Sequence, residues 1–186
     1  RDVLPLLTKE IEDQARSVAV GEFPLVALVD QLSSRFWLKF PDIQALLERL
    51  FVQAVKQGPS EALEKLALAL VRLQKKDALF RILDERSQIE SGGDANHFST
   101  VLKAISMALL RTGYAGNIYA AVGIVKRFRH CIVPDDLDKI AERIVDSVAS
   151  SQNLDAMARI LPQYADGFLK DWREYALKRL ADVCRF

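Results

Sequence analysis

The chain has 186 residues, of which 26 are Lys or Arg and 25 are Asp or Glu, so its formal net charge at neutral pH is +1. This balance gives no electrostatic reason to expect duplex nucleic acid or a membrane surface as the main ligand. The longest uninterrupted apolar run, residues 66–71, is far shorter than the roughly 20 residues that a transmembrane helix requires. We therefore expect a globular chain with no membrane insertion.

Cysteine usage suggests the compartment in which such a protein works. Two cysteines, Cys131 and Cys184, are too few for a disulfide framework or a cysteine zinc site. They favour a reduced, intracellular compartment, in which both pack as small hydrophobic groups.

The chain begins at Arg1 rather than Met and ends at Phe186 directly after a helical pattern. We interpret the chain as a piece of a longer array.

Apolar residues recur at three- and four-residue spacing along nearly the whole chain, whereas strand-like alternation is hard to find. Proline near helix starts and glycine near helix ends mark the boundaries, most clearly at Pro41 and Gly58. Residues 87–96 contain two adjacent glycines and are predicted to be a flexible loop, the most mobile internal segment. The pattern predicts an all-α fold with about ten helices, at residues 3–18, 24–36, 41–57, 60–73, 77–85, 98–111, 117–129, 135–150, 154–163 and 169–183.

An internal repeat organises these helices. Residues 63–67 resemble residues 137–141, and residues 77–83 resemble residues 155–161, in the same order on consecutive predicted helices. Residues 177–181 look like the first helix of a further copy. A period of about 36 to 40 residues containing two helices is typical of an α-solenoid of antiparallel helical hairpins.

We accordingly predict one helical-repeat domain over residues 1–186. Its parts are N-terminal helices in residues 1–59, a first recognisable hairpin in residues 60–96, and further hairpins with a terminal helix in residues 97–186. Leu66 and Ile140 hold equivalent places on matched helices, so both are expected to be almost fully buried.

Residues 98–104, followed after a helical hairpin by residues 132–135, resemble a pentatricopeptide repeat. Such repeats open with an aromatic-polar-polar-apolar-Leu turn and close on an Ile-x-Pro-Asp junction, and this copy has both. His130-Cys131 stands where a glycine is usual, and tetratricopeptide repeats share the same hairpin geometry. The resemblance implies an organellar, mitochondrial protein that binds single-stranded RNA, with Ser99 and Asp135 facing a base.

A basic cluster lies at the end of the predicted helix 117–129. Lys126, Arg127, Arg129 and His130 surround Phe128, a grouping that could hold phosphates and stack a base. The alternative is that these cations gather at a helix C-terminus because they suit its dipole.

Two tryptophans are candidate anchors for a protein partner, because Trp concentrates binding energy at interfaces. Trp37 lies in the aromatic-rich segment 36–40, and Trp172 opens the last amphipathic helix. The alternative for Trp37 is a corner of the core, and the terminal helix that Trp172 opens must either be capped by polar residues or bury its apolar face against something else.

No residues form a recognisable catalytic or cofactor-binding constellation. His97 and His130 lie far apart without ligand-spaced neighbours, and the glycines of the loop lack the Lys-Ser/Thr of a phosphate-binding loop. We therefore expect no enzyme activity, no cofactor and no metal. The leading hypothesis is a protein-protein interaction scaffold; the alternative is an organellar, pentatricopeptide-like RNA-binding protein acting in RNA processing or translation.

Overall fold

The computed structural model describes Lys9, Asp13 and residues 25–32, 37–57, 60–90, 95–151 and 154–183. Within these residues every regular element is a helix and none is a strand, so the predicted all-α class is confirmed. The predicted helix at residues 3–18 lies outside the described residues apart from Lys9 and Asp13. The chain contains two compact units, Arg1–Arg86 and Ser87–Phe186, which are described separately, and the single helical-repeat domain stays a prediction.

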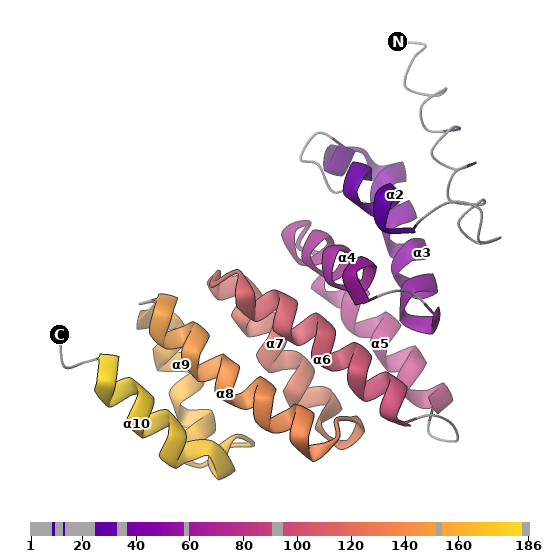
Figure 1. Cartoon of the computed structure of the whole chain (residues 1–186). Helices are drawn as coiled ribbons and strands as arrows, with labels where there is room; N and C mark the ends of the chain where they lie inside the picture. The colour runs from indigo at the N-terminus through magenta and orange to yellow at the C-terminus, as the bar shows by residue number, and fades with distance from the viewer. Residues whose placement is uncertain are drawn as a thin grey trace. The chain divides into compact units, whose positions relative to one another are not determined.

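Three helices of the first unit pack on one another: α2 (Leu25–Leu32), α3 (Pro41–Gln57) and α4 (Ser60–Arg72) (Figure 1). A short 3-10 helix, η1 (Trp37–Lys39), precedes α3, and α5 (Lys76–Glu90) follows α4. Leucines at helical spacing fill the space between the helices. Leu66 has no exposed surface, as its place in the repeat predicts.

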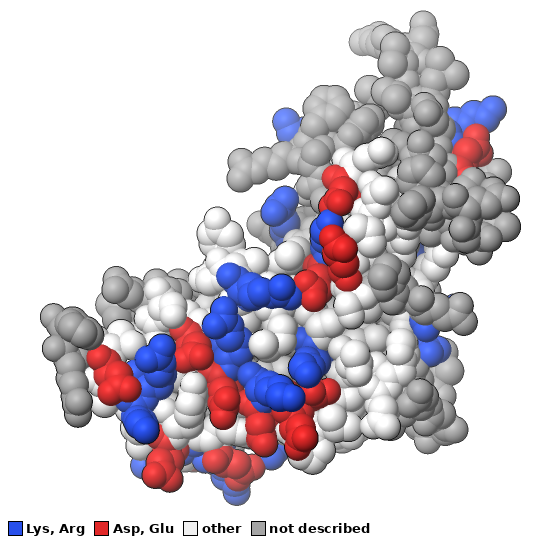
Figure 2. All heavy atoms as spheres, viewed as in Figure 1, with Lys and Arg blue, Asp and Glu red and all other residues white. Residues whose placement is uncertain are grey.

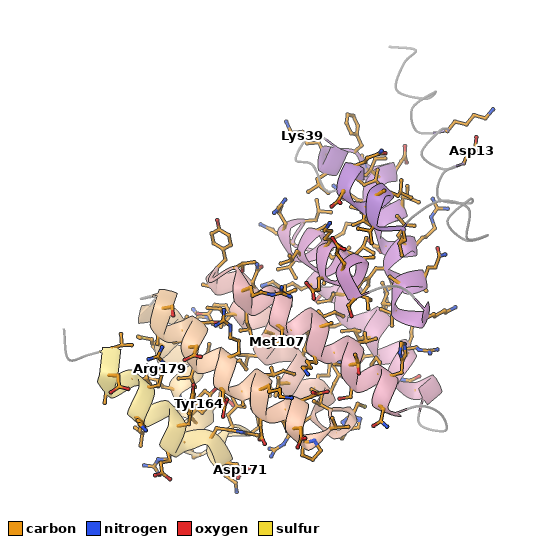
Figure 3. The ribbon with its side chains drawn as sticks, viewed as in Figure 1. Asp13, Lys39, Met107, Tyr164, Asp171 and Arg179 are labelled. Atoms are coloured by element: carbon orange, nitrogen blue, oxygen red, sulfur yellow. The ribbon has the colours of Figure 1, made fainter. Side chains whose placement is uncertain are left out.

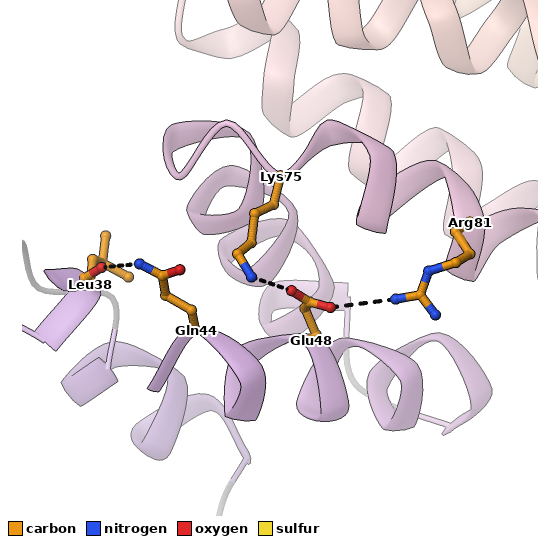
Figure 4. Close-up of polar contacts among 5 residues, drawn as sticks. All are labelled: Leu38, Gln44, Glu48, Lys75 and Arg81. Atoms are coloured by element: carbon orange, nitrogen blue, oxygen red, sulfur yellow. Dashed lines mark hydrogen bonds and ion pairs between the residues drawn. The ribbon is translucent and has the colours of Figure 1, made fainter. Parts of the chain in front are cut away.

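Polar contacts fasten α3 to the segments before and after it (Figure 4). The Gln44 side-chain amide donates a hydrogen bond to the Leu38 carbonyl oxygen at 2.9 Å. One carboxylate oxygen of Glu48 pairs with Lys75 at 2.5 Å, and the other pairs with Arg81 at 3.4 Å. Because these charges are partly exposed, each pair contributes little to stability.

The predicted loop at residues 87–96 is shorter in the structure. Helix α5 continues to Glu90, and α6 (Ala95–Arg111) already begins at Ala95. The helix persists because no proline or glycine occurs before Gly92 to end it. Residues 91–94 lie outside the described residues, so the mobility expected there stays a prediction.

In the second unit α6 packs against both α7 (Ala115–Phe128) and α8 (Pro134–Ser151), and α10 (Arg173–Val183) lies along α8 (Figure 1). The rings of Phe98 and Phe128 meet edge to face at 6.2 Å in this core. Ile140 is fully buried, which confirms the second burial prediction from the repeat. Gly113, in the turn between α6 and α7, has a φ of +68°, a left-handed conformation that favours glycine at a helix end.

The connections of the second unit include two short 3-10 helices that bear on the site. η2 (Arg129–Cys131) joins α7 to α8, and η3 (Lys170–Trp172) lies between α9 (Leu154–Ala165) and α10. The predicted helix at residues 169–183 is therefore divided into η3 and α10.

Candidate functional site

Ser99, predicted from the resemblance to face a base, is fully buried on α6. Its hydroxyl accepts a hydrogen bond from the Val133 backbone N–H at 2.9 Å and donates one to the Asp136 carboxylate at 3.3 Å. Asp136 also pairs with Lys103 of α6 at 2.7 Å. Ser99 thus ties α6 to the start of α8, and in this structure it offers no surface to a base.

Asp135, the other residue expected to read a base, is exposed in the first turn of α8. Its neighbour Asp136 makes the contacts to α6, so the two adjacent carboxylates have different surroundings. A carboxylate in this turn is favoured by the helix dipole without any ligand. Asp135 is exposed whereas Ser99 is buried, so the two side chains do not present a shared surface to a base.

The basic cluster at the end of α7 is divided in the structure. Lys126 and Arg127 are exposed, whereas Phe128 is only 1 % exposed and its ring packs against Phe98. The stacking role suggested for Phe128 has no geometric support here, because the ring lies in the core. The partly exposed Arg129 follows in η2 and makes contacts of its own.

Arg129 and Trp172, which the sequence suggested for two different roles, lie together. The Arg129 guanidinium carbon is 5.5 Å from the centre of the Trp172 ring, a cation-π contact. The same guanidinium donates to the Phe168 carbonyl at 2.7 Å and pairs with Asp171 at 2.8 Å. On the other side, the indole N–H of Trp172 donates to Asp138 of α8 at 2.8 Å. Trp172 is thus held in place by a cation and a carboxylate.

These residues line an open groove of about 700 Å³, here named the Trp172 groove. Its apolar lining consists of Ile132, Pro134, Leu137 and Trp172. Its polar lining consists of Arg129, His130, Asp138 and Asp171. Ile132 and Leu137 are nearly buried, whereas His130, Asp138 and Asp171 are exposed, so the groove has an apolar floor and a polar margin. Figure 3 labels Asp171, which lies near the start of α10.

Sequence reasoning identified Arg129 and Trp172 but missed Leu137, Asp138 and Asp171 as their neighbours. One local signal was present: Pro134, Leu137 and Asp138 share one face of α8 at helical spacing. Nothing local indicates that η2, η3 and this face meet.

A second polar cluster lies between α8 and α10. Arg179 pairs with Asp146 at 2.8 Å, and the Tyr175 hydroxyl donates to the same carboxylate at 3.4 Å (Figure 3 labels Arg179). The buried Tyr164 hydroxyl donates to the Ala141 carbonyl at 2.7 Å, and burial raises the pKa of this phenol. The nearby apolar space, lined by Leu161 and Leu180 among others, is about 10 Å³, too small for a ligand. This cluster holds α10 on α8.

Other kinds of site were sought in the same residues. Within the described part of the chain, no group of three or more His, Cys, Asp or Glu side chains is arranged to hold a metal ion. None of the described helices is long and apolar enough to span a membrane. Trp37 belongs to η1, but its side chain lies outside the described part, so its suggested role stays a prediction.

Comparison with protein-family models, with curated proteins and with solved structures finds no match for this chain. The resemblance to pentatricopeptide repeats stays a prediction, and any functional conclusion must come from the Trp172 groove.

Proposed function

We propose that this chain is a non-catalytic helical module that binds a protein partner, and that the Trp172 groove takes a short segment of that partner. The observation that carries this proposal is a tryptophan held in position beside an apolar floor. Trp and Arg are the side chains that most often dominate binding energy at protein interfaces. Because Trp172 is already fixed by Arg129 and Asp138, little side-chain entropy is lost when a ligand covers it.

The proposed module is the α-solenoid of antiparallel hairpins that the repeat predicts. Support comes from the side-chain bonds that link different helices of the second unit, most of which join residues about one repeat apart. Lys103 and Asp136 are separated by 33 positions, Ser147 and Leu110 by 37, and Arg129 and Asp171 by 42. Such separations are expected when each hairpin contacts its neighbours along a stack.

The alternative, single-stranded RNA binding, has less support from the geometry. Modules of that kind use a positively charged groove with exposed aromatic rings on which bases stack. Here Phe128 is buried, and Figure 2 shows basic and acidic side chains interleaved over the visible face of the second unit. Of the predicted RNA site, Lys126, Arg127 and Asp135 are exposed.

The test is a selection of random peptides displayed on phage against the whole chain, with the Trp172→Ala variant used for counter-selection. We expect peptides that bind the parent chain and lose at least about tenfold in affinity on Trp172→Ala, as truncation of a central Trp typically does. Circular dichroism melts establish that the variant is folded. Trp172→Phe, which keeps an aromatic ring but cannot donate to Asp138, gives a second, milder change at the same position.

The matched control is Leu177→Ala, which removes a 58 % exposed apolar side chain from α10 outside the groove. Its affinity for the selected peptides should equal that of the parent chain. If the selected peptides bind Trp172→Ala as tightly as they bind the parent chain, the proposal is wrong. Binding of mixed single-stranded RNA at low salt, lost on replacing Lys126 and Arg127 by Ala, would support the alternative instead.

A further inference from the structure

The charges along the margin of the Trp172 groove are unequal. One arginine, Arg129, stands against two aspartates, Asp138 and Asp171, and the exposed His130 is neutral in the formal count at pH 7. The lining therefore carries an excess of one negative charge. This excess has a definite location, because the ion pair of Arg129 involves one of the two aspartates and not the other.

Arg129 is already engaged. Its guanidinium pairs with Asp171, donates to the Phe168 carbonyl and lies over the Trp172 ring. An acidic ligand would have to compete with Asp171 for this cation. The groove is therefore a poor receptor for a carboxylate or phosphate, although it contains an arginine.

Asp138 is in the opposite situation. One of its oxygens accepts the indole N–H of Trp172, a neutral donor that leaves the negative charge of the carboxylate in place. Asp138 is exposed and pairs with no cation among the residues that the structure describes. It stands beside the apolar Pro134 and Leu137 of its own helix, and the exposed Asp135 adds a second carboxylate to the same turn of α8.

We propose that the partner segment carries a lysine or arginine next to an aliphatic or aromatic residue, the apolar side chain covering Trp172 and the cation facing Asp138. This inference rests on the interaction role proposed above and adds the chemistry of the partner to it. A cation supplies the charge that Asp138 lacks, while the apolar residue covers the floor of the groove. The aliphatic stem of a lysine or arginine also packs well along an apolar surface while its charged end stays in water.

The first test uses the pool of peptides whose selection depends on Trp172. This pool should be enriched in Lys and Arg beside an apolar residue, relative to the unselected library. In one selected peptide, replacing the cation by Gln should weaken binding about two- to fivefold, the range expected for a single exposed charge pair, and Glu should weaken it further. Because such pairs are screened, the difference between the cationic and Gln peptides should shrink as salt is raised.

The second test changes the protein. Asp138→Asn keeps an oxygen that can accept the Trp172 indole N–H but removes the negative charge. It should therefore weaken binding of the cationic peptide about two- to fivefold and leave the affinity for the Gln peptide unchanged. The matched control is Asp182→Asn, which changes an exposed carboxylate of α10 outside the groove. It should change the affinity for neither peptide. Because the chain has two tryptophans, fluorescence is compared in a Trp37→Phe background, where an unchanged spectrum in Asp138→Asn shows that the Trp172 indole stays in place.

Failure of this inference differs from failure of the proposed function. A pool that depends on Trp172 but is enriched in acidic or neutral residues would overturn the cationic preference and leave the interaction role standing. The same holds if Asp138→Asn weakens the cationic and Gln peptides equally. If selection yields no peptide that depends on Trp172, both proposals are wrong.

Discussion

Ser99→Ala tests whether the Ser99 hydroxyl has a structural role or a ligand-binding role. The substitution removes a single hydroxyl from a fully buried position and leaves the rest of the side chain in place. What is lost is a pair of hydrogen bonds, the one from the Val133 N–H at 2.9 Å and the longer one to Asp136 at 3.3 Å.

The magnitude follows from what each partner loses. Val133 precedes α8, and its carbonyl accepts the first bonds of that helix, from the N–H groups of Asp136 and Leu137. Leaving its half-buried N–H without an acceptor costs about 1–2 kcal/mol, comparable with the loss of a helix cap. Asp136 loses less, about 0.5 kcal/mol, because that bond is long and Lys103 remains at 2.7 Å. The expected destabilisation is about 1.5–2.5 kcal/mol.

The assay is urea unfolding followed by circular dichroism, with amide hydrogen exchange at Val133 as a local measurement. Exchange at this amide should become faster in Ser99→Ala, because its acceptor is gone. Ser150→Ala, at an exposed serine of α8, is the control and should stay within about 0.5 kcal/mol of the parent. A Ser99→Ala variant that also stays within about 0.5 kcal/mol of the parent, with unchanged exchange at Val133, would refute this reasoning.

Two further predictions concern burial. Leu66→Ala and Ile140→Ala should each lower the free energy of unfolding in urea by about 2–5 kcal/mol, whereas Leu177→Ala, at an exposed position, should lower it by less than about 0.5 kcal/mol. A core variant that loses no more stability than Leu177→Ala would contradict the burial of that side chain. Burial raises the pKa of Tyr164 above its usual value near 10, so the native state favours the neutral phenol. The contribution of Tyr164 to stability is complete below pH 10 and is lost as the pH rises above 10. Tyr164→Phe should therefore reduce the loss of stability at alkaline pH. The measurement is the midpoint of urea unfolding at pH values from 8 to about 11.5. Tyr175→Phe is the comparison variant, because burial also raises the pKa of Tyr175. If Tyr164→Phe leaves the loss of stability at alkaline pH unchanged, the assignment of that loss to Tyr164 is wrong.

The helices could be predicted from the sequence because their signals are local. Pro41 and Pro134 stand at the first positions of α3 and α8, where a proline lacks no needed hydrogen bond. The burial of Leu66 and Ile140 was predicted from the match between residues 63–67 and residues 137–141, and both side chains are fully buried. The loop at residues 87–96 was predicted too long because a pair of glycines indicates a break but not how far the preceding helix continues.

The burial of Ser99 could not be predicted, because the apolar pattern of α6 indicates one buried stripe and the helix has two. Phe98, Val101 and Leu102 mark the first stripe, and α6 packs against α7 and α8 at once. Ser99 and Ser106 lie on the second stripe and are both fully buried. A small polar residue suits such a position when the neighbouring helix is close, and a sequence alone does not distinguish it from a surface serine.

The Trp172 groove required one more piece of information, the way in which η2, η3 and α8 pack together. Arg129 and Trp172 were each recognisable from residue type, but their contact depends on η2 lying against η3. The repeat indicates a period of about 36 to 40 residues, whereas the bonds that build the groove join residues 34, 39 and 42 positions apart. That spread exceeds one helical turn, so the period alone does not select which residues meet. Residue type therefore identifies candidate members of such a site, and the packing of η2, η3 and α8 decides which of them lie together.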